Sequence, residues 1–341
     1  MYFRTYFKEK SLSYLFGISL FLFSVPNLMA GEKPIVQLKD FTQVEVKAGG
    51  FILPSDARIH IYALGGGTGK KYVFQSSSMY AYGWIINADT RELVWKMDRY
   101  NTTKEHNYQK FDDKILLSKG NYEVYFSAYG FASNSALSNF NTNIDRRRDY
   151  SKDGDNRKGF LSWLEELFGD DLRIDWKRDA KNWEISVFVD DNLRDISTYS
   201  PTKELPNIIY KAIAIGENEH IKQRFKILAP IPIRIYALGE KDNQDALADY
   251  GWIINMKNHK RLWEMRPGNV RSAGGADKNI KFDDVVNFPA GDFILYYNTD
   301  GSHSYVDWNA PPPIDPFNYG ITLMVTDEQK KNDFKLISGG T

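Results

Sequence analysis

Cysteine is absent from the 341 residues of the chain. The protein therefore cannot carry a lipid anchor on an N-terminal cysteine, and no disulfide can stabilise it in an oxidising compartment. Because covalent cross-links are excluded, its stability must come from packing. Aromatic residues are plentiful instead, at 15% of the sequence, and they favour sheets because their side chains pack well on a pleated surface.

An excess of charge of one sign is also missing. Lys and Arg together number 44, Asp and Glu together also number 44, and the formal net charge is therefore zero. This balance gives no signal for nucleic acid and none for strong attraction to an anionic membrane, so neither is expected as a partner. Hydrophobic residues make up 42% of the chain, which is enough for packed cores, and the length predicts two domains.

A long apolar run is missing from residues 31–341, whereas the N-terminus contains one. A basic head, the apolar segment Leu12–Val25 and the small residue Ala30 follow one another there. This order predicts a signal peptide over residues 1–30 that is cleaved after Ala30. The segment is shorter than the roughly 20 residues that a membrane-spanning helix needs, so no integral membrane segment is expected after cleavage. An uncleaved anchor stays open, because Leu28 is an unusual residue three places before the cut.

The hexapeptide YGWIIN occurs twice, at Tyr82–Asn87 and at Tyr250–Asn255. Its neighbours repeat in the same order in both halves of the chain, which means that one domain is present twice. We therefore expect two domains after the signal peptide, over residues 31–200 and 201–341. The further matching segments are IYALG (61–65 and 235–239), RELVWKM and HKRLWEM (91–97 and 259–265), KFDD (110–113 and 281–284), KGNYEVYFSA and AGDFILYYNT (119–128 and 290–299), and DAKNWEISVFV and DPFNYGITLMV (179–189 and 315–325).

Apolar and polar residues alternate inside these segments, which predicts strands. Each copy gives about eight short strands separated by Gly, Asp, Asn or Pro turns. The predicted fold class is all-β, with two tandem antiparallel β-sandwich domains that are jelly-roll-like. In the hexapeptide we expect Trp84 and Ile86 on one face of a core strand and Gly83 and Ile85 on the other. One short helix, Lys158–Asp171, is predicted inside an insertion of the first copy at about residues 130–178.

The segment TDGSHSYVDWNAPPP near the C-terminus is the sharpest local feature of the sequence. Its Ser and His residues are adjacent, so their side chains diverge in an extended chain and cannot form a catalytic triad. A ligand surface is the first interpretation, because an aromatic ring packs on the C–H face of a sugar while amide and carboxylate groups bind hydroxyls. In the alternative the tryptophan is a lid on the sandwich core. The candidate ligand-binding residues are His303, Asp307, Trp308 and Asn309.

A second candidate site precedes the predicted helix. DYSKDGDNRKGF places oxygen ligands at Asp149, Ser151, Asp153 and Asp155, with Gly154 for a sharp turn, as in the first half of a calcium loop. Nearby basic residues favour the alternative of a solvated charged loop. Calcium is thus the only cofactor that the sequence suggests.

The sequence gives no sign of catalytic machinery. The pairs Asp112–Asp113 and Asp283–Asp284 occur in both copies, but adjacent residues of a strand point to opposite faces and cannot work as an acid/base couple. We expect them to cap a turn before a strand. The five histidines have no metal-ligand spacing, and we predict that the protein is not an enzyme.

A strand that ends in IYALG, followed by YGWIIN, LVWKM and a turn before FPAGDFILYY (Phe288–Tyr297), resembles the prepeptidase C-terminal class of bacterial β-sandwich modules. The resemblance covers both copies, whereas SHSYVDWN lies outside the pattern. It implies secreted, non-catalytic modules that accompany extracellular hydrolases and of which some bind calcium.

These patterns together predict an exported, non-catalytic binding protein in the periplasm or outside the cell, with carbohydrate or a cell-surface protein as its partner. Two alternatives stay open. The tandem could be a structural or assembly component of an extracytoplasmic complex, or an accessory module of a secreted hydrolase system.

Export can be checked on the protein from its native host. Mass spectrometry should find a mature chain that begins at Gly31, because the signal peptide is removed after Ala30. A soluble cytoplasmic protein that retains Met1 would contradict this prediction.

Overall fold

The computed structural model describes residues 33–41, 45–67, 79–106, 108–128, 179–189, 193–201, 207–242, 244–305, 308 and 310–337. Residues 34–341 belong to one compact unit. Among these described parts of the chain, no helix has both the length and the apolar character needed to cross a membrane. The calcium-loop residues 149–155 and the predicted helix 158–171 lie outside the described residues.

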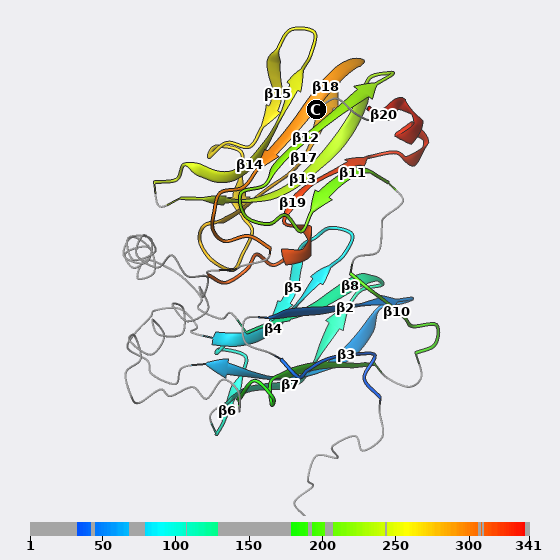
Figure 1. Ribbon diagram of the computed structural model, residues 1–341. Helices are drawn as coiled ribbons and strands as arrows, with labels where there is room; N and C mark the ends of the chain where they lie inside the picture. The colour runs from blue at the N-terminus through cyan, green and yellow to red at the C-terminus, as the bar shows by residue number, and fades with distance from the viewer. Residues whose placement is uncertain are drawn as a thin grey trace, which may run out of the picture. The chain divides into compact units, whose positions relative to one another are not determined.

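The described residues of the first copy form ten strands, whereas the sequence pattern predicted about eight. Their course can be followed in Figure 1. The strands are β1 (Val36–Leu38), β2 (Val46–Leu53), β3 (Ala57–Gly67), β4 (Met79–Asn87), β5 (Leu93–Lys96), β6 (Thr103–Glu105), β7 (Tyr108–Leu117), β8 (Gly120–Ser127), β9 (Glu184–Val189) and β10 (Ser197–Tyr199).

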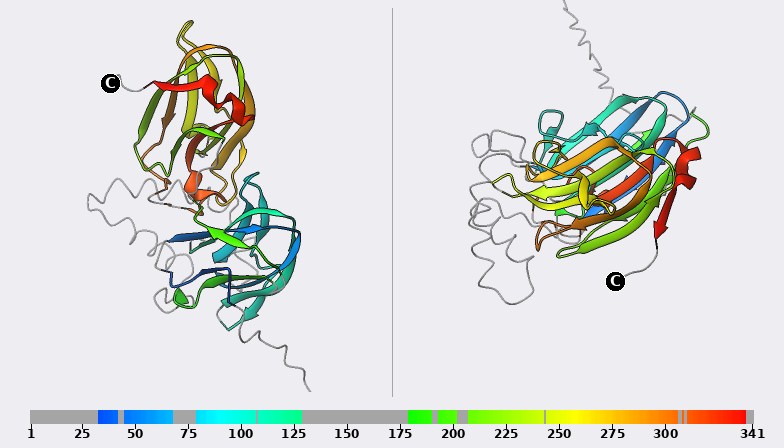
Figure 2. Two further views of the ribbon diagram at one scale, coloured as in Figure 1. Left: turned by 90° about the vertical axis from the view of Figure 1, so that its right-hand side faces the viewer. Right: turned by 90° about the horizontal axis from the view of Figure 1, so that it is seen from above.

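The second copy repeats this set, and Figure 2 gives two further views of the strands. Two short 3₁₀ helices, η2 (Pro316–Asn318) and η3 (Glu328–Asp333), accompany them. The strands are β11 (Ile208–Ile213), β12 (His220–Ile227), β13 (Ile231–Lys241), β14 (Leu247–Asn255), β15 (Lys260–Glu264), β16 (Arg271–Ser272), β17 (Asn279–Phe288), β18 (Gly291–Asn298), β19 (Gly320–Val325) and β20 (Phe334–Ile337).

Both copies have the same antiparallel topology, which confirms the prediction of an all-β fold in two tandem domains. In the first copy β9, β3 and β7 lie side by side, and β4, β8, β2 and β10 form the other run of neighbours. β3 and β4 pair only at Gly66↔Ala81 and Gly67↔Met79, where the chain passes from one layer to the other. The second copy repeats every pairing, with each strand number raised by ten.

The glycine of IYALG explains why this segment repeats. A Cβ atom at Gly65 would collide with the carbonyl oxygen of Ala81, and one at Gly239 would collide with that of Asp249. In each copy the glycine therefore allows the two backbones to approach closely where β3 meets β4, or β13 meets β14. This corner also places the residues that follow the glycine beside the start of the next strand.

The repeated hexapeptide has a different environment in the two copies. Trp84 is 2% exposed and its indole Nε1 donates a hydrogen bond of 2.7 Å to the carbonyl oxygen of Ile314. Both faces of β4 are buried there, because Ile314 and Phe317 from the second copy pack against the first core. In β14 only alternate residues are buried, and Trp252 is half-buried. One-sided burial is the usual state of an antiparallel strand, so the first copy is the exception.

Arg91 lies at the centre of a buried charge cluster. It bonds both carboxylate oxygens of Asp315 at 2.8 and 2.5 Å and both of Glu123 at 2.9 and 2.8 Å. Tyr236 donates its hydroxyl to Asp315 at 2.8 Å, and Tyr125 donates its hydroxyl to Glu123 at 2.6 Å. Burial alone would raise the pKa of Asp315, but the charge of Arg91 and the hydrogen bonds from Arg91, Asn318 and Tyr236 together hold that pKa below its usual range. The cluster thus satisfies charges that would otherwise be costly to bury.

The sequence suggested that the paired aspartates cap turns, and this prediction is wrong. They lie inside β7 and β17, where Asp112 pairs with His60 Nε2 at 2.8 Å and Asp283 accepts a bond from Arg234 Nε at 2.7 Å. His60 and Arg234 stand on the neighbouring strands β3 and β13. A carboxylate in the middle of a strand is therefore balanced by a cross-strand partner instead of turn N–H groups.

Two substitutions test how much the covered hexapeptide contributes to stability. Trp84→Ala should lower the free energy of unfolding by about 3–5 kcal/mol, because a buried tryptophan leaves a cavity. The matched control Trp252→Ala should cost clearly less, since that side chain already meets solvent. Urea unfolding of the full chain measures both. An equal loss in the two variants would show that the two hexapeptides are equally buried in solution.

Candidate functional site

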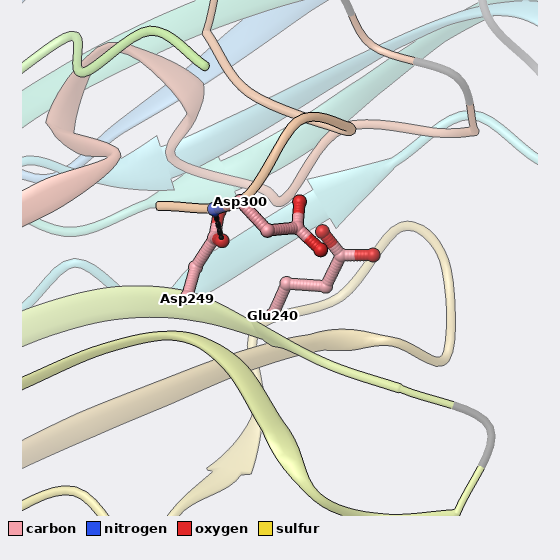
Figure 3. A group of neighbouring side chains, drawn as sticks. All are labelled: Glu240, Asp249 and Asp300. Atoms are coloured by element: carbon pink, nitrogen blue, oxygen red, sulfur yellow. Dashed lines mark hydrogen bonds between the residues drawn. The ribbon is translucent and has the colours of Figure 1, made fainter. Parts of the chain in front are cut away.

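Three carboxylates converge at one end of the second copy, and Figure 3 shows them. Glu240 stands near the end of β13, Asp249 stands near the start of β14, and Asp300 follows β18. One carboxylate oxygen from each lies within 4.8 Å of the others. Glu240 and Asp249 are cross-strand partners directly after the Gly239 corner, so the fold itself brings them together.

Glu240 is only partly satisfied. It is 5% exposed, and its Oε1 accepts a bond of 2.6 Å from Lys278 Nζ. Its Oε2 is buried and has no hydrogen-bond partner among the described residues. In Figure 3 the carboxylate of Glu240 points toward that of Asp300. A buried carboxylate oxygen without a donor costs free energy, so this atom indicates that the site lacks a partner group within the described part of the chain.

Asp249 and Asp300 are tied to each other through the backbone. Asp249 is fully buried, and its two oxygens accept bonds from Tyr319 OH at 2.5 Å and from the backbone N–H of Asp300 at 2.8 Å. Asp300 is exposed and accepts bonds from the N–H and hydroxyl of Ser302 at 2.9 and 3.3 Å. The cluster thus has a buried floor and one carboxylate open to solvent.

The two buried carboxyls hold their protons tightly. Burial raises the pKa of Glu240 to about 8, although Lys278 opposes the shift. Burial likewise raises the pKa of Asp249 to about 7, against the hydrogen bonds from Tyr319 and the Asp300 backbone. The negative charge of Asp300 adds to both shifts. The site therefore needs either protons or another positive charge near neutral pH.

Among the described residues of the first copy, no such cluster occurs at the equivalent corner. Gly66 and Ala81 form the cross-strand pair that corresponds to Glu240 and Asp249. The carboxylates of Glu240 and Asp249 therefore have no counterpart in that pair. Aligning the repeated segments residue by residue would have revealed this difference, because acidic residues stand there opposite Gly and Ala.

Two of the four sequence-predicted ligand residues are described, and both are buried. His303 is fully buried and its Nε2 lies 2.6 Å from Asn279 Oδ1. Trp308 is 5% exposed and packs edge-on against His303 and Tyr319, with ring centroids 5.0 and 5.1 Å apart. This burial is what the lid interpretation expects. A ligand surface made of these side chains stays a prediction.

The other predicted site residues lie outside the described residues. They are Asp307 and Asn309 of the ligand surface, and Asp149, Ser151, Asp153 and Asp155 of the calcium loop.

A row of aromatic side chains forms a second feature of the second copy, which we call the aromatic face. Trp252 stacks on Tyr296 at 5.1 Å and lies 5.3 Å from Tyr250, and all three side chains are half-buried. The guanidinium of Arg261 lies 5.6 Å from the centre of the Trp252 ring. The aromatic face is the counterpart of Tyr82, Trp84 and Tyr125 in the first copy, which are 4%, 2% and 0% exposed.

The strand beside the aromatic face also differs between the copies. In the first copy β2 places Val46, Ala48 and Gly50 in register with β8. In the second copy β12 places His220, Lys222 and Arg224 at the same positions beside β18. Small apolar residues suit a face that other side chains cover, whereas long charged residues suit a face in water. This contrast is a sequence signal for the aromatic face that the pattern of strands alone did not reveal.

No protein-family model matches the chain, and a comparison with curated proteins finds no match.

The raised pKa values predict a pH dependence of stability. The ordinary pKa values of Glu240 and Asp249 are 4.5 and 3.8, and in the folded chain they rise to about 8 and about 7. The folded state thus holds protons that the unfolded state releases. Their contribution to stability is complete below about pH 4 and is lost as the pH rises through 7 and 8, at about 1.4 kcal/mol per pKa unit.

The double variant Glu240→Gln, Asp249→Asn carries neutral amides at every pH and serves as the reference. Urea unfolding between pH 4 and pH 8 with a chelator present should show wild-type stability falling relative to this variant. Parallel curves would mean that both carboxyls titrate normally.

Proposed function

We propose that the protein is an exported, non-catalytic binding protein whose aromatic face takes the ligand. One observation carries the proposal: the same aromatic row is buried beneath Ile314 and Phe317 in the first copy and is only half-buried in the second. Half-buried aromatic rings in a row are costly to leave in water and are typical of surfaces that bind.

Carbohydrate is the ligand class that fits this face best. The flat rings of Trp252, Tyr250 and Tyr296 offer surface for the C–H face of a sugar. Lys222 and Arg261 are exposed at its border, and Arg224 is half-buried beside them. These cations can donate hydrogen bonds to hydroxyls or carboxylates, so an acidic polysaccharide suits the face better than a neutral one.

The export signal and the resemblance to secreted bacterial modules support a location in the periplasm or outside the cell. The same resemblance would also fit an accessory role beside secreted hydrolases, in which the protein binds the sugar and the hydrolase cleaves it.

A second candidate function is assembly with a partner protein, and the covered row of the first copy favours it. In the first copy the aromatic row is covered by protein, with a hydrogen bond from Trp84 to a backbone carbonyl. The second copy could bind a partner protein in the same way. However, the charged residues of the Arg91 cluster are not kept in the second copy. Arg91 corresponds to His259, which is exposed, and Glu123 corresponds to Ile294, which is half-buried. Such a partner would therefore need chemistry other than that of Asp315.

Substitution of the aromatic face tests the proposal. Trp252→Ala should abolish binding of acidic glycans on an array while the melting temperature stays close to that of the wild type, because the side chain is half-buried. Val285→Ala is the control, since Val285 is exposed at 46% on β17, in the other layer of the sandwich.

The arms of the experiment separate the alternatives. Loss of glycan binding in Trp252→Ala alone supports carbohydrate. If wild type binds no glycan but self-associates or retains a protein partner through Trp252, the assembly function replaces it. Glycan binding that survives in Trp252→Ala would place the ligand elsewhere and contradict the proposal.

A further inference from the structure

The carboxylate cluster is separate from the aromatic face, and its excess of negative charge gives it a different chemistry. Glu240, Asp249 and Asp300 bring three negative charges to one place, and Lys278 brings one positive charge. When all four groups are ionised the site therefore keeps an excess of two negative charges. In a largely buried position such an excess requires a counter-charge, because mutual repulsion is weakly screened there.

The unpartnered oxygen of Glu240 is a second and separate observation. Every other buried oxygen of the cluster has a donor: Lys278 for Glu240 Oε1, Tyr319 and the Asp300 backbone for Asp249. Only Glu240 Oε2 is left without one among the described residues. This oxygen belongs to the carboxylate that faces Asp300, so it is available as a ligand.

The distances fit one metal ion. Two oxygens bound to the same Ca²⁺ at about 2.3–2.6 Å lie at most about 5 Å apart, and the cluster keeps its three oxygens within 4.8 Å of one another. The donors are all carboxylate oxygens, which suit Ca²⁺, Mg²⁺ or Mn²⁺ and not the soft or nitrogen-preferring metals. Ca²⁺ tolerates irregular geometry and a mixture of protein and water ligands, whereas Mg²⁺ requires a near-ideal octahedron.

We propose that Glu240, Asp249 and Asp300 bind a single hard divalent cation, with Ca²⁺ as the preferred ion. The exposed carboxylate of Asp300 provides the route of entry from solvent. The bound ion ties the segment after β18 to the corner between β13 and β14. At the corresponding corner of the first copy, Gly66 and Ala81 offer no side-chain oxygen in place of Glu240 and Asp249.

Calorimetric titration of the chelator-treated full chain with CaCl₂ tests the site, and MgCl₂ is a parallel titration. We expect Ca²⁺ to bind more tightly than Mg²⁺ and to raise the melting temperature, because an ion that binds only the folded state stabilises it. Asp300→Asn should weaken Ca²⁺ binding by more than about tenfold, since the amide carries no negative charge and its single oxygen is a weaker ligand than a carboxylate. Asp300 is exposed, so this variant is expected to fold even if Glu240→Gln does not.

The control is Asp245→Asn, which removes a carboxylate that is 73% exposed in the turn between the same two strands. It should bind Ca²⁺ like the wild type. A further variant, Asp153→Asn, tests the loop that the sequence suggested for calcium. Undiminished binding in Asp300→Asn, loss of binding only in Asp153→Asn, or a wild type that binds neither ion would each overturn the proposal.

A positional readout complements the titration. Tb³⁺ replaces Ca²⁺ in oxygen sites and emits when a tyrosine close by is excited, and Tyr319 is hydrogen-bonded to Asp249 at 2.5 Å. Tb³⁺ bound here should show tyrosine-sensitised emission that added Ca²⁺ abolishes and that Asp300→Asn lacks. Emission of full strength in Asp300→Asn would place the ion elsewhere.

Discussion

The bidentate pair between Arg91 and Asp315 is the contact on which the arrangement of this chain depends. Both side chains are buried, so each would be strongly destabilising without the other. Asp315 belongs to the segment that covers the aromatic row of the first copy, beside Ile314, whose carbonyl accepts the Trp84 hydrogen bond. The ion pair therefore fixes the orientation of the segment 314–317 in a contact that is otherwise largely apolar. Hydrophobic burial attracts the two surfaces, and the charges fix which residues meet.

Duplication gave the chain two aromatic rows of the same design, and their surroundings separated their roles. The first row became part of a core, beside small residues on β2. The second row kept its rings partly in water and acquired cations on β12. The copies also differ at the β3–β4 corner and its counterpart, the β13–β14 corner. Gly66 and Ala81 in the first copy correspond to Glu240 and Asp249 in the second. The aromatic face and the carboxylate cluster therefore both lie in the second copy, on a scaffold shared with the first.

The carboxylate cluster shows how a fold can hold charges that repel one another. Glu240 and Asp249 cannot move apart, because backbone pairing between β13 and β14 fixes them directly after a close contact at Gly239. Burial raises the pKa values of both carboxyls and the charge of Asp300 adds to the shifts, while Lys278, Tyr319 and one backbone N–H oppose them only in part. Protons or a bound cation can balance the site, and the ligands of the proposed cation would come from three separate segments of the chain.

The sequence by itself determined the repeat, the strand period and the fold class, because these follow from local alternation and from matching segments such as YGWIIN. It also singled out Trp308 with the alternative of a core lid, and the burial of that side chain agrees with the lid. Only the tertiary structure decided which of two identical tryptophans is covered, since Trp84 and Trp252 differ in partners and not in local sequence. Likewise, Glu240, Asp249 and Asp300 are separated along the chain, and nothing in their own segments marks them as neighbours. Strand pairing and the corner at Gly239 bring them together, which is information that the one-dimensional pattern does not contain.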